Sequence, residues 1–114
     1  MHALSPGESF KLVERRGDGD TVVLTLLGEL DIGTVAEVQQ RLDALRDARQ
    51  ATLLELDELS FMDSTGIRLL LGAREDAMRV SWSFHVTRGS APVRRVLEAA
   101  QVIDHLPYVD RAEA

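Results

Sequence analysis

Two short apolar segments, at residues 21–27 and 51–56, lie on either side of a segment with helical spacing. The first is rich in β-branched residues, and the second is almost continuously apolar, with leucine at positions 53, 54 and 56. A strand that is apolar on both faces is typical of a parallel sheet covered by helices. Between the two segments, apolar residues recur at helical intervals at Val35, Val38, Leu42 and Leu45. A strand–helix–strand unit of this kind predicts two neighbouring parallel strands.

The flanking segments extend this alternation. Residues 10–15 predict a strand, and the Gly-Asp-Gly-Asp turn at 17–20 joins it to residues 21–27 as an antiparallel hairpin. Residues 57–63 are expected to form a loop before a helix at 64–78, and residues 80–87 alternate as a strand with one exposed face. Thr34 is a candidate cap of the first helix, and a third helix is expected after Ser90. The inward residues expected on the second and third helices are Ile67, Leu70, Leu71, Met78, Val93, Val96, Leu97 and Ala100.

The resulting order, β-β-α-β-α-β-α, predicts an α/β fold with a mixed, mostly parallel sheet and helices packed against it. At 114 residues the chain is long enough for one domain. Its formal charge of −6 disfavours nucleic acid as a partner, and the absence of cysteine excludes disulfides and thiolate metal sites. No apolar run reaches membrane-spanning length and no signal peptide is visible, so we expect a cytoplasmic protein without a membrane partner, metal or cofactor.

A hydroxyl group is predicted at the start of the second helix. There a hydrophobic loop ends in Asp-Ser-Thr-Gly at 63–66, directly before an apolar helical run. The N–H groups and the dipole of a helix N-terminus favour a negative group, so Ser64 is either a helix cap or a site of phosphorylation. Asp63 could equally be the cap, and Thr65 offers a second hydroxyl. Gly66, costly inside a helix, indicates either a close approach by another group or a structural cause, namely a tight turn or a helix–sheet contact.

Other residues near Ser64 have two interpretations each. Phe61 and Met62 are either core residues or part of a docking surface. Asp31 follows the strand at 21–27 and, alone, would be an ordinary turn residue. Because sites on such sheets lie beyond the carboxyl ends of the parallel strands, we expect Asp31 and Ser64 to lie close together.

Two motifs carry a resemblance to a known family. Gly-Glu-Leu-Asp at 28–31 and Leu-Ser-Phe-Met-Asp-Ser-Thr-Gly at 59–66 resemble the STAS domain of bacterial anti-sigma factor antagonists. The resemblance covers residues 10–107 and implies a single STAS domain over residues 1–114. In that family the antagonist binds an anti-sigma factor, often a serine kinase, and so frees a sigma factor. The kinase inactivates the antagonist by phosphorylation, and a PP2C-type phosphatase restores it.

The resemblance also implies roles for particular residues. By position in the motif, Ser64 is the phosphoacceptor, between Asp63 and Thr65-Gly66, and Asp31 is the acidic residue near it. Arg68 departs from the pattern, because a small residue is common there, and this could alter the choice of partner. The residues expected to contact the partner are Asp31, Phe61, Met62, Asp63, Ser64, Thr65, Gly66 and Arg68.

Several alternatives remain. A serine hydrolase is disfavoured because Gly-x-Ser-x-Gly is absent, and the histidines at 2, 85 and 105 show neither metal-ligand spacing nor a spacing to Ser64 that suggests a base. A receiver domain phosphorylated at Asp57 lacks the required acidic pair after the first strand and the late lysine. The remaining competitor is a structural STAS module of a transport, lipid-trafficking or stress-sensing complex, without a phosphorylation switch.

Overall fold

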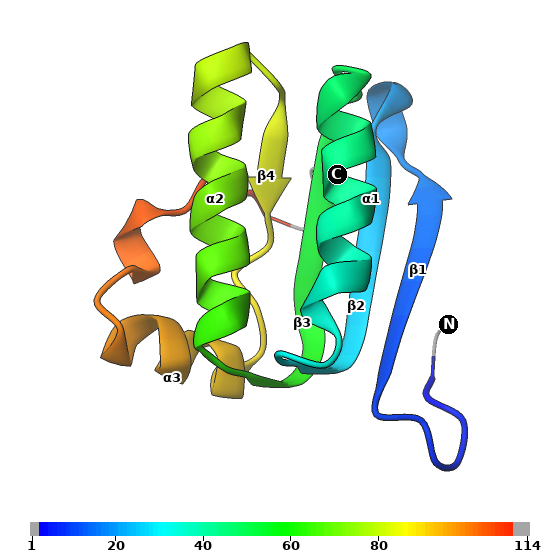
Figure 1. Cartoon of the computed structure of the whole chain (residues 1–114), viewed down its shortest axis with the longest axis vertical. Helices are drawn as coiled ribbons and strands as arrows, with labels where there is room; N and C mark the ends of the chain where they lie inside the picture. The colour runs from blue at the N-terminus through cyan, green and yellow to red at the C-terminus, as the bar shows by residue number, and fades with distance from the viewer. Residues whose placement is uncertain (1–2, 111–114) are drawn as a thin grey trace.

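The computed structural model describes residues 3–110, so His2 lies outside the described part of the chain. Within those residues, four strands form one sheet in the order β1-β2-β3-β4. Helices α1 and α2 lie side by side on one face of the sheet, and α3 lies at the end of the molecule where α2 begins (Figure 1). The elements are β1 (Phe10–Arg16), β2 (Val22–Leu30), α1 (Val35–Asp47), β3 (Thr52–Met62), α2 (Ser64–Val80), β4 (Phe84–Val86) and α3 (Ala91–Ala99).

The pairing of the strands confirms the predicted mixed sheet. β1 and β2 form an antiparallel hairpin, whereas β2 pairs in parallel with β3 and β3 in parallel with β4. A short 3-10 turn at Asp18–Asp20 connects the hairpin, with Gly19 at a φ of 63°. The predicted order β-β-α-β-α-β-α is therefore confirmed.

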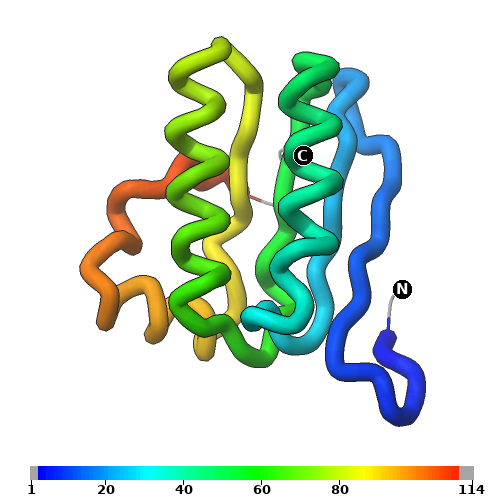
Figure 2. Tube along the Cα trace, viewed as in Figure 1, coloured from blue at the N-terminus to red at the C-terminus, as the bar shows by residue number. Residues whose placement is uncertain are grey.

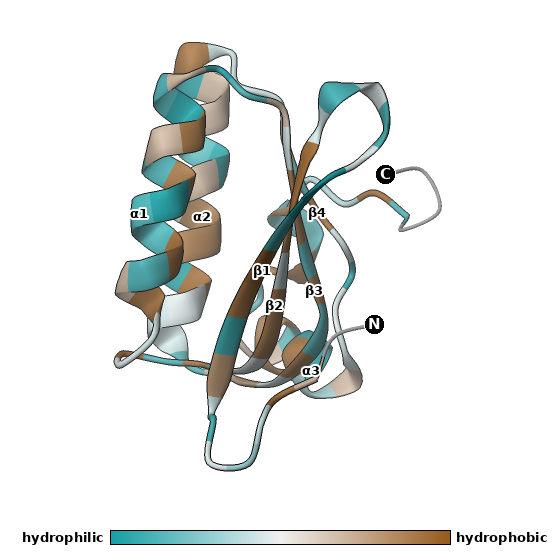
Figure 3. Ribbon diagram, turned by 90° about the vertical axis from the view of Figure 1, so that its right-hand side faces the viewer, coloured by the Kyte–Doolittle hydropathy of each residue, from teal (hydrophilic) through white to brown (hydrophobic). Residues whose placement is uncertain are grey.

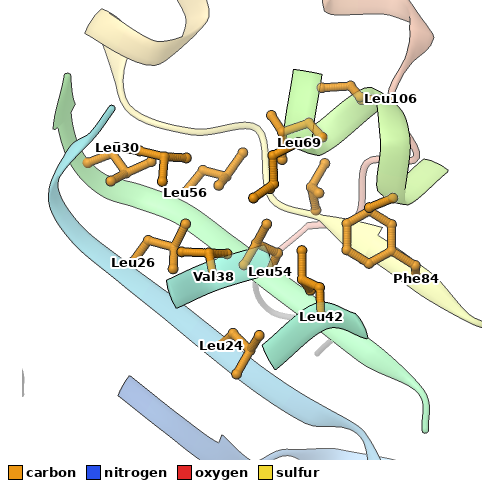
Figure 4. Packing of buried hydrophobic residues seen from close by; sticks show 14 of the residues in the cluster. Leu24, Leu26, Leu30, Val38, Leu42, Leu54, Leu56, Leu69, Phe84 and Leu106 are labelled. Atoms are coloured by element: carbon orange, nitrogen blue, oxygen red, sulfur yellow. The ribbon is translucent and has the colours of Figure 1, made fainter. Parts of the chain in front are cut away.

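The hydrophobic core lies between the sheet and the pair of helices α1 and α2, which Figure 3 shows stacked on the same side. Leucine side chains of β2 and β3 point toward α1 and α2 and meet Phe84 of β4 (Figure 4). The predicted inward positions Val38, Leu42 and Leu45 of α1 are buried. At roughly 1.5–3 kcal/mol for each fully buried large aliphatic side chain, this core is the main stabilising term of the fold.

β3 is longer than predicted. Residues 57–63 were expected to form a loop, but the strand continues to Met62. The reason is that β2 also continues, past Gly28 to Leu30, and its backbone offers partners to β3 as far as the pair Leu30–Met62. Gly28, at a φ of 89°, permits an irregularity in the ladder instead of ending the strand.

The strand predicted at 80–87 is wrong over its first half. α2 extends through Val80 and ends at Ser81, whose left-handed φ of 56° turns the chain out of the helix. β4 then covers only Phe84–Val86, although Trp82 is still buried and donates from Nε1 to the carbonyl of Gln50 at 2.7 Å.

Three predicted side-chain placements need correction. Met78 was expected to point inward but is 71% exposed, near the C-terminal end of α2. Ala100 is exposed because α3 ends at Ala99. Thr34 precedes α1 but does not cap it; its hydroxyl instead donates to the carbonyl of Glu29 at 2.8 Å.

Within residues 3–110, none of the helices combines the length and the apolar character that crossing a membrane requires.

Candidate functional site

The connections β2–α1 and β3–α2 lie next to each other at one edge of the sheet. Leu30 and Met62 are the last paired residues of β2 and β3, so Asp31 and Asp63 each follow a strand end. The N–H of Asp63 donates to the carbonyl of Leu30 at 3.2 Å, which ties the two connections together. Figure 2 shows both at the same end of the molecule. The structure thus places the segments of Asp31 and Ser64 side by side.

Asp63, not Ser64, caps α2. Its carboxylate accepts a hydrogen bond from the N–H of Thr65 at 2.9 Å, and its carbonyl accepts from the N–H groups of Gly66 and Ile67 at 3.1 and 3.3 Å. The carboxylate therefore satisfies one donor that every helix start leaves unpaired. Ser64 is consequently the first residue of the helix proper.

The same contacts hold Asp63 in its charged form. The Thr65 hydroxyl, which donates to the carboxylate, is the main cause that lowers the pKa of Asp63, and the N–H groups of Thr65, Gly66 and Ile32 lower it further. Burial opposes this shift but does not reverse it. Because the N–H of Ile32 is one of the groups that lower the pKa of Asp63, the Asp63 carboxylate also interacts with the β2–α1 connection. The start of α2 therefore carries a fixed negative charge at neutral pH.

The two hydroxyls after Asp63 differ in their surroundings. Ser64 is exposed, and among the described residues its side chain makes no hydrogen bond. Thr65 is half-buried, and its hydroxyl is occupied by the carboxylate of Asp63. Only the Ser64 oxygen is therefore available without breaking an existing contact.

Gly66 is needed because α2 packs closely against the strands. A Cβ at this position would lie 2.6 Å from Cγ of Met62 and 3.1 Å from Cδ2 of Leu30, both of which are buried. Of the two explanations open at the level of sequence, the tight helix–sheet contact accounts for this glycine. The contact fixes the depth at which the start of α2 lies on the sheet.

The two apolar residues before Asp63 have different environments. Met62 is 1% exposed and belongs to the core, whereas Phe61 is 46% exposed. Ile32, which was not among the residues predicted for the site, is 79% exposed in the neighbouring connection. An isoleucine inside the polar turn at 31–34 was the available signal. Phe61 and Ile32 thus give the edge around Ser64 two exposed apolar side chains.

Asp31 has a local structural role. Its carboxylate accepts from the N–H of Gly33 at 2.9 Å and from the hydroxyl of Thr34 at 3.3 Å, which closes the turn into α1. This is the ordinary turn role expected of Asp31 by itself. Its position next to the capped start of α2 also leaves a second carboxylate at this edge.

A groove of about 360 Å³ runs between the first turns of α1 and α2. The groove is lined by Val35, Ala36, Gln39, Thr65, Arg68 and Leu69. Of these residues, Arg68 is exposed and forms no ion pair with the described residues.

Residues 3–110 contain no group of three or more His, Asp or Glu side chains placed to hold a metal ion.

Replacing Gly66 with alanine is expected to destabilise the protein, and replacing Gly72 is expected to stabilise it. Overpacking at Gly66 costs about 1–3 kcal/mol, because Met62 and Leu30 cannot move away within the core. Gly72 lies in the same helix with no atom within 4 Å of an added Cβ, so Gly72→Ala should gain about 0.4–1 kcal/mol. Urea unfolding of both variants checks this; equal effects of the two substitutions would contradict the contact assigned to Gly66.

The charge of Asp63 predicts a pH dependence of stability. Because its pKa in the folded state lies below the ordinary 3.8, the unfolded chain takes up the proton first, and the stabilisation is present above that value and lost as the pH falls through the folded pKa. Asp63→Asn keeps a capping side chain but removes the charge. The difference in free energy of unfolding between the wild type and this variant should therefore narrow from pH 7 to pH ~3. A difference that stays constant over that range would show that the charge of Asp63 contributes nothing to the stability of the fold.

The chain is similar to known proteins in sequence and in fold. The model of the STAS domain family matches residues 13–113. An anti-sigma F factor antagonist of Lysinibacillus sphaericus is 32% identical over 81 residues, which cover 69% of this chain and 69% of that protein.

Two solved structures share the fold. The crystal structure of an anti-sigma factor antagonist from Mycobacterium paratuberculosis has a TM-score of 0.79 at 23% identity, over 96% of this chain and 94% of that chain. The Bacillus cell fate determinant SpoIIAA, in its phosphorylated form, has a TM-score of 0.68 at 23% identity, over 90% and 95% of the two chains. The match of the family model over most of the sequence, together with the mixed sheet and its helices, shows that the chain belongs to the STAS domain family.

Proposed function

We propose that this protein is an anti-sigma factor antagonist whose binding is controlled by phosphorylation of Ser64. The unmodified form binds an anti-sigma factor that is also a serine kinase, and so releases a sigma factor. Phosphorylation of Ser64 ends the binding, and a PP2C-type phosphatase restores it. The role of the relatives named above supports the general function, and the exposed, unbonded hydroxyl of Ser64 is the observation that carries the switch.

The surroundings of Ser64 favour it as the acceptor over Thr65. A kinase must place the acceptor oxygen in line with the phosphoryl group that it transfers. The Ser64 oxygen can be placed there without breaking a hydrogen bond to any described residue. The Thr65 hydroxyl would first have to leave the carboxylate of Asp63, which lies at the cap of α2. Phosphate on Thr65 would also place a second negative charge directly beside that carboxylate, which would repel it.

The proposed modification is a simple phosphoryl transfer. The Ser64 oxygen attacks the terminal phosphorus of a nucleoside triphosphate held by the kinase, its proton passes to a base of the kinase, and the nucleoside diphosphate leaves. The reverse step is hydrolysis, in which water attacks the phosphorus and inorganic phosphate is released. Neither step requires a catalytic group of this protein, so it acts as substrate and binding partner and not as an enzyme.

The added charge would act on a surface that is suited to docking when unmodified. Phosphate brings about −1.5 to −2 charges at neutral pH. It would stand beside the exposed Ile32 and Phe61 and the carboxylates of Asp31 and Asp63. A charge left unpaired in an interface costs roughly 2–5 kcal/mol, enough to reduce the affinity by tens- to thousands-fold. The fold itself is not strained, because Ser64 points away from the core.

The surface we propose for the partner is the edge that carries these residues. Ile32 and Phe61 supply apolar area, Arg68 supplies a cation, and Ser64 is the first residue of α2, directly after the β3–α2 connection. Met62 and Gly66 support this edge from within the core. The proposed interaction requires no nucleic acid, membrane or cofactor and takes place in the cytoplasm.

The first test is phosphopeptide mass analysis of the protein purified from its native host, across growth and stress conditions. One phosphate on Ser64 is expected, absent in Ser64→Ala and still present in Thr65→Val. Thr65→Val keeps the shape of the side chain and removes only its hydroxyl. Phosphate on Thr65 would overturn the choice of acceptor. An unmodified protein under every condition would favour a structural STAS module without a switch.

A further inference from the structure

Arg68 lies one helical turn after Ser64 on the same face of α2. Residues four apart in an α-helix are separated by roughly 40° around the axis, and their Cβ atoms lie about 5–6 Å apart. Side chains on a helix also lean toward its N-terminus, so a long side chain at position 68 covers the turn that contains position 64. The guanidinium of Arg68 can therefore reach a group attached to Ser64 without a change in the backbone.

Arg68 is also free to make a new contact. Among residues 3–110 its guanidinium forms no ion pair or hydrogen bond. The two arginines of α1 are already paired: Arg46 with Asp76 at 2.9 Å and Arg41 with Glu14. Arg79, at the far end of α2, pairs with Asp76 at 2.9 Å.

We propose that Arg68 is the internal counter-ion of phosphate on Ser64, and that phosphorylation draws its guanidinium away from the groove between α1 and α2. This inference rests on the proposed function, because it concerns the modified form of the same site. A guanidinium offers two parallel N–H donors that match two phosphate oxygens, and such charge-assisted pairs are stronger than neutral hydrogen bonds.

The pairing would change two parts of the surface at once. The groove is lined by Arg68 together with Val35 and Leu69, so loss of the guanidinium removes its cation. The phosphate would in turn be partly neutralised, in a place where the carboxylates of Asp31 and Asp63 would otherwise repel it. The switch would thus both add a negative charge at Ser64 and remove a positive charge from the groove.

The test uses the full chain with phosphoserine incorporated genetically at position 64, so it needs no kinase. The second ionisation of the phosphate, which has a pKa near 6, is followed by ³¹P NMR. Arg68 should lower this pKa by a few tenths of a unit relative to the Arg68→Gln variant, because a nearby cation favours the doubly charged form. Arg68→Lys should retain part of the shift, and Arg79→Gln, a matched loss of charge on the same helix, should leave it unchanged. The carboxylates of Asp31 and Asp63 are common to all four proteins and cancel in the comparison.

The groove is observed in the same samples through the methyl groups of Val35 and Leu69. Their resonances should shift on phosphorylation in the wild type and not in Arg68→Gln. Equal phosphate pKa values in the wild type and Arg68→Gln would overturn the pairing. Methyl groups that respond equally with and without Arg68 would overturn its departure from the groove. Absence of phosphate on Ser64 in the host would instead refute the proposed function. It would not change the NMR results on Arg68, because in those samples the phosphoserine is incorporated genetically.

Discussion

The parallel pairing of β2 with β3 determines where everything else in the candidate site can lie. The pairing extends to Leu30 and Met62, and so brings the two connections after these strands to one edge, joined by the N–H of Asp63 and the carbonyl of Leu30. Gly66 then allows α2 to begin directly against the side chains of this last pair. The position of the Ser64 hydroxyl is thus a consequence of backbone pairing and close packing, with Asp63 capping the helix at that point.

Hydrophobic spacing alone predicted most of the architecture. The alternation of strand-like and helix-like segments predicted the hairpin, the parallel pairs and the buried face of α1. Burial on one or both faces of an element requires apolar residues at regular intervals, and these intervals can be read in the sequence. The C-terminal end of β3 was wrong because it depends on partners offered by β2, and the beginning of β4 was wrong because α2 continues through Val80. Gly28 looks like a break in the sequence, yet β2 continues through it. Single-residue propensities carry no trace of such partners.

The candidate site shows the same division. The motif predicted a helix start at Ser64 and a nearby Asp31, but sequence left open which side chain caps the helix and why Gly66 is there. Both answers come from contacts: Asp63 bonds to Thr65, and Gly66 lies against Met62. Ile32 was missed because one exposed apolar residue in a turn has no periodicity. Its place in the candidate site follows only from the structure, which shows that its side chain is exposed in the connection next to Asp63.

Ser64 is therefore placed where a change of charge alters the surface and leaves the core untouched. The most direct measurement is the equilibrium binding, by calorimetry, of the unmodified chain and of the Ser64-phosphorylated chain to a kinase-like anti-sigma factor from the same genome. We predict that phosphorylation weakens binding by tens- to thousands-fold while the circular dichroism spectrum stays native. Equal affinities of the two folded forms would contradict the account.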